Sequence, residues 1–199
     1  MKIIQVDQGS PEWHSCKVGI PSSSNFDKIV DSKGLPSKQQ KKYLNQLAGE
    51  KILGYAEGTY QNAAMIRGIE LEAQAREVYS FITDQEVEQV GFCITEGKTI
   101  YGASPDGIIG KEGLLEIKCP QLSTQVDYLL ANELPIEYWQ QTQGQLLVTG
   151  RKWVDFFSFY PGLNPLLIRV LPDEKFVKSL KIELELFCEQ LEELVAKIR

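Results

Sequence analysis

The sequence predicts one α/β domain over residues 1–199, with a mixed central sheet of about five strands flanked by helices. The chain has 199 residues, 43% of them hydrophobic, which suffices for one good core and lies within the usual size of one domain. Strongly β-forming runs occupy residues 87–119 and 152–171. Segments with helical periodicity precede, separate and follow these runs, as is typical of a sheet covered by helices.

Six segments have the apolar spacing of helices. Ser22 or Ser23 is a suitable N-cap for the first of them. The last begins at Pro172-Asp173-Glu174 and carries a long apolar stripe, which we expect to cover the sheet. The expected helices are 22–30, 37–53, 60–82, 124–131, 135–149 and 172–198, and the expected strands are 87–94, 99–103, 107–109, 114–119, 152–160 and 166–171.

Neither a membrane segment nor a cysteine framework is indicated. No apolar run approaches the roughly 20 residues that span a bilayer, and the N-terminus lacks the pattern of a signal peptide. We therefore expect a cytoplasmic protein with no membrane partner. The four cysteines are scattered and form no CxxC pair, which favours core thiols over a zinc site or disulfides; they are Cys16, Cys93, Cys119 and Cys188.

Ionisable residues concentrate around a predicted hairpin, whose strands 107–109 and 114–119 are joined by the four-residue turn 110–113. Asp106 lies at the entrance of this hairpin. Alternate side chains of a strand share a face, so Glu116 and Lys118 should point one way, with Leu115 and Ile117 pointing into the core on the other. The hairpin would then bring Asp106 beside Glu116.

Two carboxylates in that position can hold a hard divalent cation, with the Ile117 carbonyl as a third ligand and Lys118 beside the metal. Such a site has the parts that phosphodiester hydrolysis needs: a polarised phosphoryl oxygen, an activated water and positive charge near phosphorus. The alternative is an inert hairpin in which Glu116 and Lys118 form a surface ion pair worth about 0–1 kcal/mol.

Ser104-Pro105-Asp106-Gly107, followed by Leu115-Glu116-Ile117-Lys118-Cys119-Pro120, resembles the PD-(D/E)XK signature of the phage lambda exonuclease and YqaJ-type viral recombinase exonuclease family. The similarity includes the residues that flank the charged positions. It implies a restriction-endonuclease-like core and a nuclease site at Asp106, Glu116 and Lys118.

Residues 9–26 combine a turn, an aromatic residue and serines that either cap a helix or hold a phosphate together with Lys17. This segment resembles the family's W-H-x-x-(R/K)-x-G-x-x-x-S stretch. The resemblance implies that Lys17 and Ser24 bind the terminal 5′-phosphate of DNA. The neighbouring Trp13 is expected to be a core residue, and His14 a packing or capping residue.

Two further segments resemble family motifs. Within the helix 60–82, the pattern G-x-x-x-E-x-x-A-R implies that Glu72 completes the metal site and that Arg76 joins the 5′-phosphate contacts; without the resemblance the glutamate would be a surface charge. In the helix 135–149, either Gln141 or Gln143 matches a glutamine-bearing motif, and both would otherwise be solvent-facing amides.

The resemblance implies an Mg²⁺-dependent exodeoxyribonuclease, for which Mn²⁺ substitutes, that digests linear double-stranded DNA from the 5′ end and leaves a 3′ single strand. It also implies a ring-shaped homotrimer, a single-strand annealing protein as partner, and a phage or prophage origin with activity in the bacterial cytoplasm. Two alternatives stay open: a RecB-like or Cas4-like nuclease of the same fold with four cysteines around an iron–sulfur cluster, and a non-catalytic nucleic-acid-binding module.

The net charge of −6 opposes binding of a polyanion unless charge is distributed unevenly. Lysines gather between Lys33 and Lys51, and glutamates gather between Glu183 and Glu193. We expect the lysine region to face the inner channel of a ring, with the acidic C-terminal helix outside and beyond a Debye length of about 8 Å.

Overall fold

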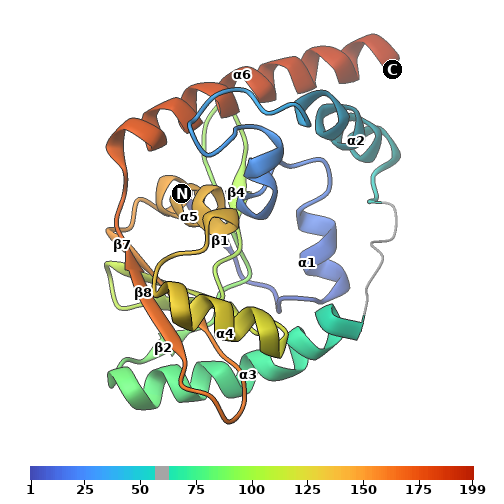
Figure 1. Ribbon diagram of the computed structural model, residues 1–199. Helices are drawn as coiled ribbons and strands as arrows, with labels where there is room; N and C mark the ends of the chain where they lie inside the picture. Colours follow the sequence, from blue (N-terminus) through green and yellow to red (C-terminus); the bar gives the residue numbers. More distant parts are fainter. Residues whose placement is uncertain (57–62) are drawn as a thin grey trace.

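The computed structural model describes residues 1–56 and 63–199 (Figure 1). The first residues of the helix expected over 60–82 therefore lie outside the described part. The elements in chain order are β1 (Lys2–Ile4), α1 (Pro11–Cys16), η1 (Ser23–Lys28), α2 (Gln40–Leu53), α3 (Ala63–Thr83), β2 (Val87–Glu88), β3 (Phe92–Ile94), β4 (Gly102–Ala103), β5 (Gly107–Ile109), β6 (Gly113–Lys118), α4 (Leu122–Ala131), η2 (Ile136–Tyr138), α5 (Trp139–Thr149), β7 (Trp153–Ser158), β8 (Leu166–Val170) and α6 (Glu174–Ile198).

The predicted five-stranded mixed sheet is confirmed. Its order is β2-β5-β6-β7-β8, and every pair is antiparallel except β6 and β7, which are parallel. A parallel pair requires a long crossover, and here α4, η2 and α5 form it. This crossover brings α5 back across the sheet beside β6.

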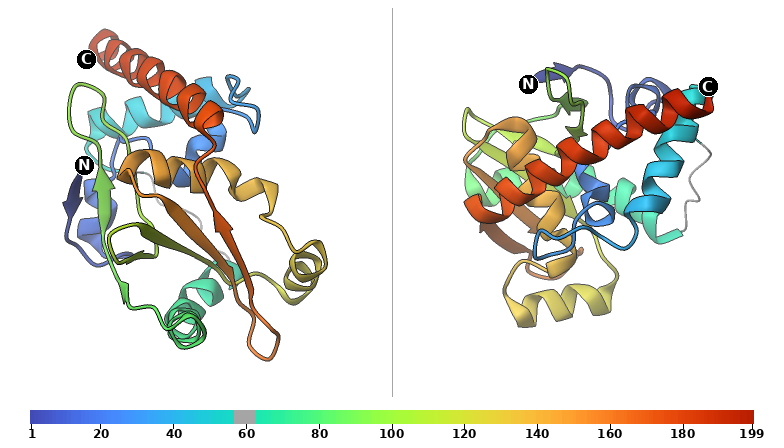
Figure 2. Two further views of the ribbon diagram at one scale, coloured as in Figure 1. Left: turned by 90° about the vertical axis from the view of Figure 1, so that its left-hand side faces the viewer. Right: turned by 90° about the horizontal axis from the view of Figure 1, so that it is seen from above.

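Helices cover both faces of this sheet. In Figure 2, left, α6, α5, the sheet and α3 follow one another from top to bottom. Leu114 and Phe156 belong to the core on the α5 side, whereas Leu115 and Ile117 pack with Tyr79 of α3 on the other side. Because both faces of β6 are covered, the surface position that the alternative of an inert hairpin gave to Glu116 is wrong.

A second sheet of order β1-β3-β4 was not predicted as a separate unit. The run expected as one strand over 87–94 divides into β2 and β3, which belong to different sheets. Gly91 lies at the break, and a Cβ there would come within 2.4 Å of the Val6 carbonyl oxygen and 2.5 Å of that of Ile4. The close passage of the N-terminal segment therefore requires glycine at this position.

Three local predictions are corrected. The hairpin turn has three residues rather than four, because Ile109 pairs directly with Gly113, and Gly110 adopts the left-handed conformation (φ +49°) that such loops use. The segment after Ser22 is a 3₁₀ helix, and the Ser22 side chain does not cap it. The helix expected over 37–53 begins at Gln40.

The acidic and basic segments are neighbours, which contradicts the expected separation. Helix α2 packs against α6, and the rings of Tyr43 and Phe187 stack at 5.7 Å. Lys51 forms an ion pair with Glu192 across this contact. Part of the lysine region is thus neutralised within the chain.

The cysteines are free, and two of them match the expectation of core thiols. Cys93 and Cys188 lie in the main core, whereas Cys16 and Cys119 are partly exposed at the ends of α1 and β6. Within residues 1–56 and 63–199, no helix combines the length and apolar character needed to cross a membrane.

Candidate active site

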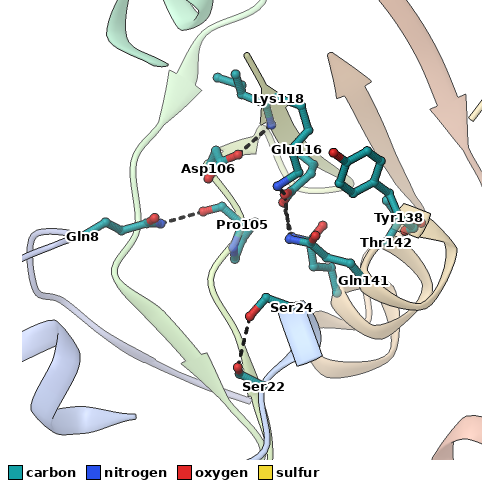
Figure 3. Close-up of polar contacts among 12 residues, drawn as sticks. Gln8, Ser22, Ser24, Pro105, Asp106, Glu116, Lys118, Tyr138, Gln141 and Thr142 are labelled. Atoms are coloured by element: carbon teal, nitrogen blue, oxygen red, sulfur yellow. Dashed lines mark hydrogen bonds and ion pairs between the residues drawn. The ribbon is translucent and has the colours of Figure 1, made fainter. Parts of the chain in front are cut away.

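Asp106 and β6 form the base of the site, where the hairpin closes on itself. Asp106 directly precedes β5, and its Oδ2 accepts a hydrogen bond of 2.6 Å from the Ile117 backbone N–H (Figure 3). This bond spans the two strands of the hairpin. It fixes the aspartate carboxylate beside the C-terminal half of β6, as the sequence predicts.

Glu116 is buried on the α5 side of the sheet, with 1% of its surface exposed. Its Oε1 accepts from Lys118 Nζ at 2.5 Å and from Gln141 Nε2 at 2.6 Å. Its Oε2 accepts from Gln145 Nε2 at 2.5 Å. Three donors, one of them charged, compensate the removal of this carboxylate from water.

The electrostatics of the pocket favour cations and oppose anions. Burial raises the pKa of Asp106 well above its ordinary value, and the nearby charges of Glu116 and Glu72 raise it further. Burial opposes the positive charge of Lys118, but Glu116 and Asp106 together hold the pKa of Lys118 above its ordinary value. Lys118 is therefore a fixed cation at neutral and alkaline pH.

Helix α3 forms the opposite wall of the pocket. The Glu72 carboxylate pairs with Arg76 at 2.5 Å, and Arg76 Nε also donates to the Asp106 carbonyl at 3.4 Å. Arg76 thus contacts the loop that carries Asp106 and Glu72 of its own helix rather than the segment of Lys17 and Ser24. The pocket has a volume of about 350 Å³ and is lined by Gly68, Ile69, Glu72, Asp106, Ile117, Lys118, Cys119, Pro120 and Tyr138.

The N-terminal segment holds the loop that carries Asp106. Gln8 donates from its amide to the carbonyls of Val90 and Pro105, at 2.8 and 2.9 Å (Figure 3). The indole of Trp13 donates to Ser104 Oγ at 3.1 Å. Sequence reasoning gave Gln8 no role, because nothing local marks a glutamine as the partner of a loop 97 residues away.

Lys17 and Ser24 lie at two elements, α1 and η1, that contact the segment leading to Asp106. The Lys17 ammonium lies 3.4 Å from the centroid of the Trp13 ring, and burial lowers the pKa of Lys17 to about 8. Ser24 is exposed on η1, and its hydroxyl lies 3.3 Å from that of Ser22. Each residue is linked to this segment through a neighbour. Lys17 packs on Trp13, which donates to Ser104, and Ser24 lies beside Ser22, which forms a β-bridge with Gly102.

Helix α5 divides its glutamines between two faces. Gln141 and Gln145, one turn apart, both donate to Glu116. Gln143 is fully buried elsewhere, where its amide donates to Leu171 O at 2.9 Å and its oxygen accepts from Asp173 N at 2.8 Å. The structure thus brings Gln141 rather than Gln143 to Glu116, together with Gln145, which the i, i+4 spacing from Gln141 could have indicated.

Comparison with known protein families matches residues 12–152 to the YqaJ-like viral recombinase domain. The chain belongs to this family. The matched region contains every site residue expected from the sequence, from Lys17 to Gln143. No curated protein matches the chain by sequence.

Solved structures agree with membership of the YqaJ-like family. The alkaline exonuclease LHK-Exo from Laribacter hongkongensis is 30% identical, with a TM-score of 0.86 over 95% of this chain and 96% of that one. The same protein in complex with dAMP gives a TM-score of 0.87. A phage-related exonuclease from Haemophilus somnus 129PT shares the fold at 13% identity, with a TM-score of 0.66 over 90% of this chain and 96% of that one.

The donors in the pocket of this YqaJ-like domain suit a hard divalent cation. Asp106 lines the pocket and Glu116 lies beside it on β6, and both offer oxygen ligands. A cation would offset the neighbouring glutamate charges that, after burial, raise the Asp106 pKa. Among the described residues, no group of three or more His, Cys, Asp and Glu side chains is close enough to hold a metal alone. Main-chain oxygen and water would complete the shell, as is usual for Mg²⁺, and the Ile117 carbonyl stays the predicted third ligand.

Proposed function

We propose that this protein is a Mg²⁺-dependent exodeoxyribonuclease that digests linear double-stranded DNA in the 5′ to 3′ direction, with Mn²⁺ as a substitute metal. The observation that carries the proposal is the convergence of Asp106, Glu116 and Lys118 at the end of β6. Asp106 and Lys118 line one pocket, Asp106 is held by the Ile117 N–H at 2.6 Å, and the buried Glu116 pairs with Lys118 at 2.5 Å. Membership of the YqaJ-like family and similarity to a protein named an alkaline exonuclease support it.

The chemistry follows from the roles that these side chains can fill. Asp106 and Glu116 would hold the cation, which when bound polarises the phosphodiester and lowers the pKa of water. Lys118 keeps its proton and stabilises the negative charge that develops around phosphorus. Gln141 orients the Glu116 carboxylate without adding charge, and Glu72 adds negative charge to the pocket wall while Arg76 fixes its position.

The 5′ polarity would arise from Lys17 and Ser24. A terminal phosphate held by this ammonium and this hydroxyl would anchor the 5′ end against the loop that carries Asp106. Lysine offers a point charge rather than the bidentate fork of arginine, so its hold on the phosphate depends on its protonation.

The remaining parts of the proposal concern assembly and context. The chain would form a closed homotrimer that encloses DNA, and the 3′ strand would pass to a single-strand annealing protein in the cytoplasm of a phage-infected bacterium. Several large apolar side chains are available for subunit contacts because they are exposed on α3 and α4: Ile69, Phe81, Ile82, Leu122 and Leu130.

Substitution of the pocket residues tests the proposed chemistry. Asp106→Ala, Glu116→Ala and Lys118→Ala should each lower cleavage of linear duplex DNA by at least about 100-fold. The first two should also lose Mg²⁺ binding, whereas Lys118→Ala should retain most of it. Glu112→Ala is a matched control, since Glu112 precedes β6 but pairs with Lys152 at the exposed turn.

The outcomes separate a nuclease from an inert hairpin. More than about a tenth of wild-type activity in Asp106→Ala or Glu116→Ala would contradict the assignment of these carboxylates. Duplexes labelled at either the 5′ or the 3′ end test polarity in the same assay, because a 5′ to 3′ enzyme releases the 5′ label first. Early release of the 3′ label would overturn the proposed direction.

A further inference from the structure

Gln8 joins two segments that meet next to Asp106. Its Nε2 donates to the carbonyl of Val90 at 2.8 Å and to that of Pro105 at 2.9 Å (Figure 3). Val90 lies between β2 and β3, and Pro105 directly precedes Asp106. Gln8 itself precedes residues 12–152, the region that matches the family. Neither the family match nor the motifs that resemble the family therefore give it a role.

The backbone on both sides of Asp106 is held by a side chain. The Pro105 carbonyl belongs to the peptide group that precedes Asp106, and Gln8 donates to it. The Asp106 carbonyl belongs to the peptide group that follows, and Arg76 Nε donates to it at 3.4 Å. A peptide group is planar, so fixing its carbonyl also fixes the direction in which the chain enters or leaves Asp106. The bond from Gln8 is the shorter and therefore the better formed of the two.

The carboxylate of Asp106 needs such support because its neighbours repel it. Glu116 and Glu72 carry like charge and lie close enough to act on it. One hydrogen bond, from the Ile117 N–H to Oδ2 at 2.6 Å, holds the carboxylate against β6. That bond lasts only while the loop stays beside β6. Contacts that fix the loop therefore keep the carboxylate in place when no cation offsets the repulsion.

Trp13 connects the same two segments at adjacent residues. Its indole N–H donates to the Gly91 carbonyl and to Ser104 Oγ, both at 3.1 Å. Residues 90–91 and 104–105 are thus linked twice, but of these two donors only Gln8 contacts the peptide group bonded to Asp106. Because Trp13 still joins the segments when Gln8 is replaced, the fold should survive the loss of the Gln8 amide.

We propose that Gln8 is a positioning residue that holds Asp106 in the geometry of a metal ligand. This inference rests on the proposed metal-dependent function. Gln8 acts through the Pro105 carbonyl and needs no contact with metal or DNA. Without its amide, the Asp106 carboxylate can turn away from β6, and a cation must order the loop before it binds. The cost of this ordering should appear as weaker metal binding.

The test measures metal binding to the DNA-free protein, with no activity readout. Free Mn²⁺ is followed by electron paramagnetic resonance, and Mg²⁺ is added as competitor to obtain both dissociation constants. The variant is Gln8→Met, which has nearly the same length but no donor. We expect both constants to rise by about 10-fold, the lower end of the range seen when a residue that orients a metal ligand is removed. Circular dichroism of the metal-free variant should match that of the wild type.

Gln5→Met is the matched control. Gln5 is exposed three positions earlier in the same segment, so this variant makes the same chemical change without removing a bond to the loop of Asp106. Its dissociation constants should equal those of the wild type. If Gln8→Met does not fold, Gln8→Asn replaces it, because an amide one methylene shorter keeps the polarity of the residue but does not bridge both carbonyls.

The possible results are distinct. Unchanged metal affinity in a folded Gln8 variant would overturn the role of Gln8 while leaving the proposed nuclease function standing. Equal losses in Gln8→Met and Gln5→Met would overturn it too, because they would belong to the N-terminal segment as a whole. Absence of Mn²⁺ binding in the wild type would overturn the proposed metal site itself, and this inference with it. A loss confined to the Gln8 variant supports the inference.

Discussion

The carboxylate of Asp106 lies where burial and two neighbouring glutamates disfavour its charge. A raised pKa means that the ionised form costs stability at every pH above the folded-state pKa, and that this cost vanishes below the pKa of the unfolded chain. Asp106→Asn should therefore raise Tm in the absence of metal at pH 8, by on the order of a few °C. The gain should shrink toward pH 5, and Mg²⁺ should stabilise only the wild type.

Asp155 provides a control for Asp106→Asn, because replacing its carboxylate with an amide should lower stability rather than raise it. Asp155 is more deeply buried than Asp106, with 1% of its surface exposed, but Arg169 donates to both of its oxygens at 2.8 Å and Tyr79 donates to one at 2.7 Å. Asp155→Asn removes a charge that these donors stabilise, so it should lower stability by about 1–3 kcal/mol. Thermal unfolding followed by circular dichroism measures both variants. A lower Tm for Asp106→Asn at pH 8 would show that its carboxylate is not penalised.

Lys17 makes the expected preference for 5′-phosphorylated ends dependent on pH. Burial lowers its pKa to about 8, so the charged form prevails below pH 8 and is lost above it. The ratio of kcat/KM for 5′-phosphate over 5′-hydroxyl ends reports the free enzyme and should fall as pH rises through about 8. In Lys17→Arg the ratio should stay flat up to pH 10, because arginine does not deprotonate. A flat ratio in the wild type would argue against a phosphate contact by Lys17.

At the scale of elements, the approach of η1 to α5 depends on Gly144. A Cβ there would lie 2.4 Å from Cδ2 of Phe26 and 3.3 Å from Cβ of Ser23. Gly144→Ala should therefore displace η1, lower stability by about 1–3 kcal/mol and weaken the preference for 5′-phosphate through Ser24. Gly49→Ala, at an open position within α2, should instead raise stability by about 0.5–1 kcal/mol. If chemical denaturation gave the same change in the free energy of unfolding for Gly144→Ala and Gly49→Ala, this packing argument would be refuted.

The hairpin and α5 differ in how much of their contribution to the site could be predicted from the sequence. The position of Asp106 beside Glu116 could be predicted, because strand alternation and turn composition are local properties of the sequence. The burial of Glu116 was missed because it depends on α5 crossing back over the sheet, and a strand pattern cannot show what covers it. Gln141 and Gln143 lie two positions apart and so on different faces of α5, and the sequence does not show which face points toward Glu116. Only packing separates Gln141 and Gln145 from Gln143.

At the scale of the whole molecule, the net charge of −6 has to be reconciled with the proposed binding of DNA. A simple division into a basic inner face and a remote acidic helix does not hold, because α2 packs on α6 and Lys51 pairs with Glu192. Attraction for DNA must then come from the remaining lysines and from cations bound at the carboxylates. Such weak, salt-sensitive contacts make rapid dissociation the expected behaviour of a monomer.

A closed ring would remove this weakness, because an enclosed strand cannot leave by simple dissociation. We predict that light scattering at micromolar concentration gives three times the 22.5 kDa chain mass. After loading on one labelled duplex, digestion should continue when excess unlabelled linear DNA is added, whereas competitor present before loading should suppress it. Closed circular DNA, which offers no end for threading, should not be degraded. A stable monomer that the late competitor releases after a few cuts would eliminate the ring and leave the pocket chemistry unaffected.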